Sequence, residues 1–406
     1  MTPSPVTPGH ASSTSAPTPP ELIGCYRTMK DLAGADLLTF ASLTPPVVRE
    51  LFATADALKG EFRRGRDRET GDKETGRGEQ GKKARTNPPQ TPSRSDGARG
   101  ERAVAGASGS LRSRGLGSHA SVMAGKTAVL LFEKPSLRTK MSFETGIGLL
   151  GGRSIFMDHS AQKLGEREAV KDYARNLERW VDCIIARVFS QKILYELAAH
   201  ARVPVINALS DRFHPCQALA DLFTVAEVAA GMGKGGTPLQ EMRLAYVGDG
   251  NNVCHSLMHA ATMLGVGMTV VTPRGYAPAA DVVAECTALA RASGAKLTIA
   301  TRLAAVAAHH AVYTDVWVSM GQADQAARRR KAFAPYQVNA DVMATASRGL
   351  GLKHGSHFMH CLPAQRGVEV TDEVIDSPAS LVYEQAENRM HAQDALLAAM
   401  FAPPGR

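Results

Sequence analysis

The stretch that decides the fold is residues 127–152, TAVLLFEKPSLRTKMSFETGIGLLGG. Its apolar start, residues 129–132, predicts a buried β-strand that ends at a proline. The apolar spacing beyond the proline predicts a helix whose first turn carries Ser136, Arg138 and Thr139. Free backbone N–H groups, the positive end of the helix dipole and a guanidinium meet there, so the turn is suited to bind an anion such as phosphate. An ordinary capped helix with a surface arginine fits the local pattern equally well.

Length and composition are those of a globular protein with room for two domains. The chain has 406 residues, of which 44% are hydrophobic and 21% are charged. No apolar run approaches the ~20 residues of a membrane-spanning helix. The six cysteines form no CxxC pair, so neither a disulfide framework nor a zinc site is expected. The first 24 residues are rich in Pro, Ser and Thr, and we expect a disordered tail on a cytoplasmic protein.

The net charge of +8 is concentrated in one segment, residues 60–121. This segment holds about 14 Lys or Arg against about 8 Asp or Glu, and almost no large apolar residues. We interpret it as a disordered basic insertion, because it cannot bury enough apolar surface to offset the entropy of ordering. A basic arm that recruits RNA or an acidic partner is the alternative. The rest of the chain is nearly neutral, and no nucleic-acid partner is expected for it.

Apolar strands alternate with helical patterns along the rest of the chain, which predicts an α/β fold. The first helix is expected within residues 37–58, where two prolines open it. Two β/α series follow and predict two doubly wound parallel-sheet domains bridged by helices, with ligands at the carboxyl ends of the strands. The predicted division is a tail at 1–24, a first domain at 25–215 containing the insertion at 60–121, a second domain at 216–383, and a C-terminal helix at 384–406 that returns to the first domain.

Single motifs are weak evidence for function in this chain. GDGNN lacks the third glycine of a dinucleotide fingerprint because Val253 stands in its place, so a nicotinamide cofactor is not expected. A histidine before a proline, such as His214, is usually structural, and a cysteine next to a strand end, such as Cys361, is more often part of a core. Asp315 is harder to explain in this way, since a carboxylate inside an apolar strand must pair or face a cavity.

Seven motifs taken together carry a specific resemblance. They occur in order and at suitable spacing: FEKPSLRTKMSFE, RVF, FHPCQALAD, VGDGNNVCHSL, DVWVSMGQ, HCLPAQRG and AENRMHAQ. Over about residues 25–60 and 122–402 the chain resembles the aspartate/ornithine carbamoyltransferase family. This resemblance implies a carbamoyl-phosphate domain followed by an acceptor domain, and VSMGQ with HCLP favours ornithine over aspartate as the acceptor. The implied reaction forms citrulline and phosphate, as in arginine biosynthesis.

The resemblance also implies which residues form the site. Carbamoyl phosphate would be held by Ser136, Leu137, Arg138, Thr139, Lys163, Arg187, His214, Gln217, the Leu362 carbonyl and Arg389. Ornithine would be held by Asn252, Asp315, Ser319 and Met320. The residues expected to take part in catalysis are Asp315, Cys361, Arg138 and His214. No metal and no cofactor are expected.

The chain departs from the family pattern at a few positions. Leu137 stands where a threonine is common, which removes a hydroxyl but no backbone N–H, and Lys140 replaces a common arginine. In the family a side chain from a neighbouring subunit reaches the phosphate. Counting along the polar loop assigns Lys163 to that role, with Gln162 one residue away. By the same resemblance we expect a homotrimer whose interfaces complete each site, with the insertion looped out beside it.

The expected chemistry is attack of the ornithine δ-amino group on the carbamoyl carbon. An alkylamine has a pKa of ~10.4, so forming the neutral nucleophile at pH 7 costs roughly 4.6 kcal/mol. Holding both substrates in line can offset this with about 7–11 kcal/mol, and we expect Asp315 and Cys361 to orient the amine and ease its deprotonation. One rival interpretation is a carbamoyltransferase for putrescine or an acylated ornithine. Another is a non-catalytic homologue that binds RNA through the insertion.

Overall fold

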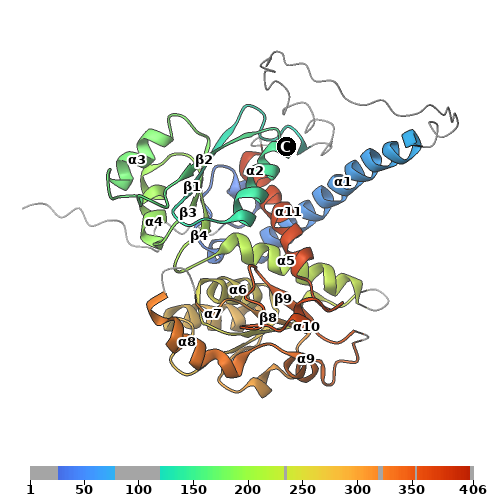
Figure 1. Cartoon of the computed structure of the whole chain (residues 1–406). Coiled ribbons are helices and arrows are strands. Elements are labelled where there is room, and N and C mark those ends of the chain that lie inside the picture. Colours follow the sequence, from blue (N-terminus) through green and yellow to red (C-terminus); the bar gives the residue numbers. More distant parts are fainter. Residues whose placement is uncertain (1–25, 78–118, 233–235, 319–322, 353, 403–406) are drawn as a thin grey trace, which may run out of the picture.

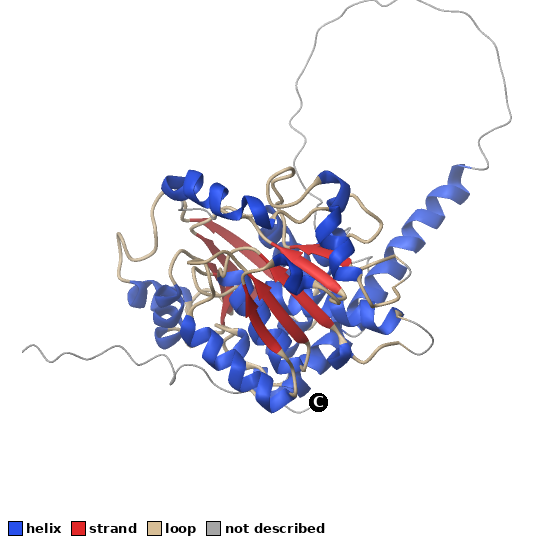
Figure 2. Cartoon of the chain, turned by 90° about the horizontal axis from the view of Figure 1, so that it is seen from below, coloured by secondary structure: helices blue, strands red, loops and turns tan. Residues whose placement is uncertain are grey.

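The computed structural model contains two parallel sheets joined by long helices (Figure 1). It describes residues 26–77, 119–232, 236–318, 323–352 and 354–402, and within 67–77 it describes the backbone only. Figure 2 shows the strands of both sheets enclosed by helices. No helix within these ranges is both long enough and apolar enough to cross a lipid bilayer.

The first sheet has the strand order β2-β1-β3-β4, and all its pairings are parallel. Its central strand β1 (Thr127–Phe132) is buried at every residue, because helices cover both faces. Leu130 and Phe132 pack with α2 (Leu137–Leu149). Val129 and Leu131 pack instead with α3 (Val170–Leu177) and α4 (Gln191–His200). The other strands are β2 (Arg153–Asp158), β3 (Cys183–Arg187) and β4 (Val205–Leu209).

The second sheet has the order β7-β6-β5-β8-β9 and is also parallel throughout. Alternate residues of its central strand again enter two cores, since Leu244 and Tyr246 lie in one and Ala245 and Val247 in the other. Its strands are β5 (Arg243–Val247), β6 (Gly267–Val271), β7 (Leu297–Ala300), β8 (Ala311–Thr314) and β9 (His357–His360). The helices of this half are α6 (Asn252–Leu264), α7 (Ala280–Ser293), α8 (Ala326–Phe333), α9 (Ala340–Ser347) and α10 (Asp372–Ile375).

Three helices connect the two sheets: α1 (Pro45–Arg77), α5 (Pro215–Gly231) and α11 (Val382–Phe401). Helix α11 packs against α5, α1 and α2, as Figure 1 shows. Lys59 of α1 is buried among them, and its ammonium donates to Glu227 Oε1 at 2.6 Å and to Asn388 Oδ1 at 2.7 Å. A single cation therefore ties together three helices that are distant in sequence.

The predicted alternation of strands and helices is confirmed, but several boundaries differ. Helix α1 continues to Arg77, beyond the insertion start predicted at residue 60, and Phe62 is buried against the core. Strand β8 already ends at Thr314, so Asp315, which was expected inside an apolar strand, directly follows it. Helices α8, α9 and α10 were not predicted. The rest of the predicted insertion, residues 78–118, and the predicted tail lie outside the described residues.

We expect Lys59→Met to destabilise the protein, because it leaves Asn388 and Glu227 without their shared cation. Hydrogen bonds to charged groups contribute about 1.5–3 kcal/mol, and the partial exposure of Glu227 reduces this, so a loss of about 2 kcal/mol is expected. The control is Lys126→Met, which removes the exposed Lys126–Asp182 pair at 2.9 Å and should cost less than about 1 kcal/mol. Urea unfolding midpoints measure both losses. Equal losses in the two variants would contradict the role given to Lys59.

Candidate active site

The N-terminus of α2 follows directly from the end of β1 and has the geometry of an anion site. Ser136 caps the helix: its Oγ accepts the Thr139 N–H at 3.2 Å and donates to Thr139 Oγ1 at 3.0 Å. The first backbone N–H groups of a helix have no partner within it, which leaves those of Leu137 and Arg138 available. The Leu137 side chain is 73% exposed. The turn therefore presents N–H groups and a positive dipole end to an incoming anion.

Three arginines surround this turn without a matching set of carboxylates. Arg389 on α11 is buried and donates to Thr139 Oγ1 at 3.1 Å and to Gln217 Oε1. Burial, together with the charges of Arg389 and Arg138, lowers the pKa of Arg187 to about 10. Burial also lowers the pKa of Arg138 and of Arg389. Within the described part of the chain, no carboxylate forms an ion pair with any of the three, so the cluster favours a multiply charged anion.

His214 and Gln217 at the start of α5 lie beside the arginines. The His214 N–H donates to Ser256 Oγ at 2.7 Å, while its buried Nδ1 has no partner among the described residues. Burial lowers the pKa of His214 well below its usual value, and the charges of Arg389 and Arg187 add to this. The imidazole is therefore neutral near pH 7. A neutral ring nitrogen suits hydrogen bonding to an uncharged carbamoyl group.

The second half of the candidate site lies beyond the ends of β8 and β9. Asp315 is buried; its Oδ2 accepts from Asn251 Nδ2 at 2.7 Å, and its Oδ1 accepts the Val316 N–H at 2.8 Å. The Cys361 thiol donates to the same Oδ1 at 3.2 Å. Burial and the Asp315 charge raise the pKa of Cys361 well above its usual value, so it stays a protonated donor. The next residue, Leu362, has a φ of 56°, a backbone conformation that is costly for a branched side chain.

Three further residues were predicted to bind ornithine: Asn252, Ser319 and Met320. Asn252 bonds other partners than Asp315 and Cys361. The Asn252 side chain donates from Nδ2 to the Ser210 carbonyl at 2.5 Å and accepts the Val253 N–H at 3.0 Å. It thereby links the loop after β4 to α6, which belong to different sheets. Ser319 and Met320 lie outside the described residues.

Lys163 lies in an exposed loop that a buried carboxylate attaches to the first sheet. Glu133 Oε1 accepts the Leu164 N–H at 2.8 Å, and its Oε2 accepts the Phe189 N–H at 2.7 Å. The Lys163 ammonium lies 4.8 Å from the centre of the Phe189 ring, and that of Lys134 lies 4.4 Å from it. Burial lowers the pKa of Lys134, and the charge of Arg187 lowers it further. Positive charge therefore extends from the arginines to this loop.

Several polar residues around the site were not among the predicted ones. Glu133 and Lys134 directly follow β1. A charged pair after an apolar run was the sequence signal that could have identified them as residues near the site. Asn251 caps α6, accepting from Val253 and Cys254, and also donates to Asp315. Its neighbour Asn252 stays the residue predicted to bind ornithine. The others are Asp221 on α5, Asp249, and Arg329, which donates to Asp249 Oδ2 at 2.9 Å and to the Trp317 carbonyl at 3.0 Å.

One group of side chains resembles a metal-ligand set. Donor atoms of Asp315, His360 and Cys361 all lie within 4.8 Å of one another. The group is already internally bonded, however, because His360 Nδ1 accepts the Leu362 N–H at 2.8 Å and the thiol donates to Asp315. The other ring nitrogen, Nε2, lies 3.4 Å from Glu369. A metal-free site stays a prediction.

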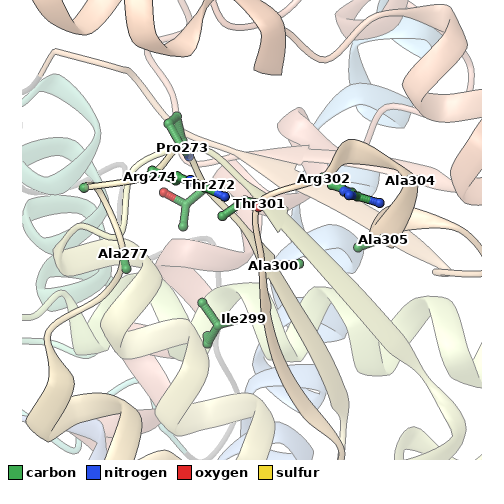
Figure 3. Close-up of a pocket in the computed structure, with 11 residues that line it drawn as sticks. Thr272, Pro273, Arg274, Ala277, Ile299, Ala300, Thr301, Arg302, Ala304 and Ala305 are labelled. Carbon is green, nitrogen blue, oxygen red and sulfur yellow. The ribbon is translucent and has the colours of Figure 1, made fainter.

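A separate cavity of about 520 Å³ opens at the ends of β6 and β7 (Figure 3). Thr272, Arg274 and Arg302 are among the residues that line it, and none of the predicted site residues does. The loop after β6 links this cavity to the candidate site, because the Tyr276 carbonyl accepts the Gly250 N–H at 2.9 Å. Gly250 has no room for a side chain, because a Cβ there would lie 2.2 Å from the Pro278 nitrogen.

Both halves of the chain match models of known domains. Residues 103–227 match the carbamoyl-P binding domain of aspartate/ornithine carbamoyltransferase. Residues 240–400 match the Asp/Orn binding domain of the same family. The two matches contain the first sheet and the second sheet, respectively.

Individual relatives agree with the domain matches. An ornithine carbamoyltransferase from Shewanella oneidensis is 50% identical over 279 residues, which cover 68% of this chain and 88% of that protein. One from Pyrococcus horikoshii is 47% identical over 284 residues, covering 70% and 86%. The solved structure of the ornithine carbamoyltransferase from Pyrococcus furiosus matches with a TM-score of 0.72 and 38% identity, over 91% of this chain and 98% of the other. The chain belongs to the aspartate/ornithine carbamoyltransferase family.

Proposed function

We propose that this protein is an ornithine carbamoyltransferase, which transfers the carbamoyl group of carbamoyl phosphate to the δ-amino group of L-ornithine. The observation that carries the proposal is the cluster of Arg138, Arg187 and Arg389 beside the α2 N-terminus. These cations lie near a carboxylate and a thiol, since Cys361 is close to all three arginines and donates to Asp315. A dianionic phosphate fits the first group and an ammonium-bearing acceptor fits the second.

The phosphate end of the substrate is assigned to the α2 turn and the arginines. Ser136, Thr139 and the backbone N–H groups of Leu137 and Arg138 would hold its oxygens. The carbamoyl group would then lie toward α5, where neutral His214 and the free N–H of Gln217 can bond its oxygen, and the Leu362 carbonyl can accept from its amino group. This arrangement polarises the carbonyl carbon and places the leaving phosphate among cations.

The acceptor end is assigned to Asp315 and Cys361 with Asn252, Ser319 and Met320. In the reaction the δ-nitrogen forms a bond to the carbamoyl carbon, the bond from that carbon to the phosphate oxygen breaks, and the proton lost by the nitrogen passes to the leaving phosphate. Because Cys361 remains a thiol, it serves as a donor that orients Asp315 rather than as a base. Positioning of the two substrates can offset the roughly 4.6 kcal/mol needed to form the neutral amine.

We also propose a homotrimer in which neighbouring subunits complete each site. Exposed apolar side chains support an interface at the edge of the first sheet: Leu137 is 73% exposed, Met141 52% and Ile155 50%. Ile155 lies on β2, the unpaired edge strand, which would otherwise present its backbone to solvent. Lys163 follows this strand and would reach a neighbour's phosphate. The domain division at residues 215 and 383 and the cytoplasmic location stay predictions.

The acceptor is tested by measuring ureido-product formation from carbamoyl phosphate with ornithine, putrescine, acetylornithine and aspartate. We expect ornithine to exceed each of the others in kcat/KM by at least about 100-fold, because a site with buried polar groups rejects substrates that leave those groups unpaired. A preference for putrescine or acetylornithine would reassign the acceptor within the family. Turnover with none of the four would exclude the enzymatic proposal.

Cys361→Ala should lower kcat about tenfold, the equivalent of one lost hydrogen bond of about 1.4 kcal/mol to Asp315. Cys361→Ser keeps a donor at this position and serves as the matched control, with most of the activity retained. Steady-state kinetics across pH 6 to 9 measure both variants. If Cys361→Ala turned over as fast as the parent with the same pH profile, the thiol would have no orienting role.

Shared sites can be tested by mixing two impaired variants, Arg138→Met and Lys163→Ala. If Lys163 acts on a neighbour's site, random reassembly of equal amounts should restore about a quarter of the parent's activity, because that share of sites combines an intact Arg138 with an intact neighbouring Lys163. Each variant reassembled alone is the control. Sedimentation confirms that the mixed samples are trimers. If their activity is not restored, Lys163 acts at its own subunit's site or at none.

A further inference from the structure

Asp221 is a buried carboxylate on α5 that receives two glutamine side chains. It lies one helical turn after Gln217 and has no exposed surface. Gln217 Nε2 and Gln385 Nε2 each donate to its Oδ1 at 2.7 Å. Its Oδ2 has no hydrogen-bond partner among the described residues. One oxygen atom therefore fixes two amides that belong to different helices.

The first amide leads to the phosphate side of the site. A carboxylate only accepts hydrogen bonds and a guanidinium only donates them, so Gln217 must turn its nitrogen to Asp221 and its oxygen to Arg389. Arg389 in turn donates to Thr139 at the α2 turn. Asp221 thereby determines which N–H of Gln217 remains free to face the substrate.

The second amide leads to the acceptor side. Gln385 Oε1 accepts the backbone N–H of His360 at 2.9 Å, and this residue directly precedes Cys361. The same logic fixes the orientation of the Gln385 amide, because its oxygen must face the His360 N–H while its nitrogen faces Asp221. The end of β9, with the thiol that bonds Asp315, is thus braced against α5 through Asp221.

We propose that Asp221 is a positioning residue that holds the two halves of the site in mutual register, one through Gln217 and Arg389 and the other through Gln385 and His360. The proposal rests on the function proposed above. It predicts that the acceptor oxygen of Asp221 matters more than its charge, since both amides use Oδ1 alone. Asparagine can supply that oxygen, whereas leucine of similar size cannot.

The ionisation of Asp221 gives a further readout. Burial raises its pKa to about 6, while the hydrogen bonds from Gln385 and Gln217 and the Arg389 charge act in the opposite direction. Arg389, Tyr313 and Cys361 are the titratable groups that face it from α11, β8 and the residue after β9. The carboxylate predominates above about pH 6 and takes up a proton below it. Asparagine resembles the protonated form, because both keep the Oδ1 acceptor without the charge. Activity should therefore fall more steeply with decreasing pH below 6 than deprotonation of the acceptor amine alone requires, but by no more than the loss in Asp221→Asn.

The experiment compares Asp221→Leu, Asp221→Asn and Asp36→Asn in the full chain. Asp36 is the matched control, because burial raises its pKa to about 6 as well, but its carboxylate accepts the Val205 N–H at 2.7 Å, at the start of β4 and remote from the site residues. Asp221→Leu should lower kcat/KM about 100-fold, as expected for a displaced catalytic constellation. Asp221→Asn should stay within about tenfold of the parent and lose the extra steepness below pH 6. Asp36→Asn should keep the activity of the parent and the same fall of activity below pH 6.

Three measurements distinguish a loss of positioning from unfolding and from a wrong function. Thermal unfolding and sedimentation show whether each variant is folded and assembled like the parent. Calorimetric titration with inorganic phosphate measures, without turnover, the phosphate affinity that depends on Gln217 and Arg389. Asp221→Leu should weaken phosphate binding. Gln385→Leu should leave phosphate binding unchanged and raise the KM for ornithine. A folded Asp221→Leu with parental kinetics, an Asp221→Asn as impaired as Asp221→Leu, or an Asp36→Asn that also loses the steepness would overturn the proposal. Failure of the parent to use ornithine would instead overturn the proposed function alone.

Discussion

The buried guanidinium of Arg389 is the interaction on which the arrangement of the site depends. A desolvated cation is stable only if acceptors surround it, and this one reaches Thr139 on α2 and Gln217 on α5. Helix α11 must therefore cross back from the second sheet to the first, and α5 must begin where β4 ends. The packing of α11 against α1, α2 and α5 provides the apolar surface that holds this crossing in place.

The two halves of the site are charged in opposite ways and supported differently. In the first sheet, cations gather on helix and strand ends without paired carboxylates, and their mutual repulsion is a cost that the fold carries until an anion binds. In the second, Asp315 is satisfied by Asn251, Cys361 and its own following N–H. The phosphate half is thus prepared for a partner from outside, whereas the acceptor half is preorganised by its own hydrogen bonds.

The sequence allowed prediction of the strands and of most clusters at their ends, because buried parallel strands are apolar runs and their carboxyl ends carry the polar residues. It did not allow prediction of the continuation of α1 beyond residue 60, since a polar segment rich in glycine gives no periodic signal even though Phe62 packs into the core. Asn251 and Asn252 are adjacent asparagines with different tasks, and only their partners distinguish them. Asp221 looked like an ordinary residue of a helix, because its significance comes from Gln385, 164 positions away.

Gly250 limits which substitutions the protein can accept, because two loops are in close contact at this residue. A Cβ at this position would meet Pro278 and Ala277 at 2.2 and 2.5 Å, so every substitution must push the loop after β6 away from the loop that carries Asn251. Variant libraries aimed at larger acceptors will therefore lose folded members at this position before any change of specificity can be selected. Gly250 therefore sets the spacing between these two loops, and with it the position of Asn251, the partner of Asp315.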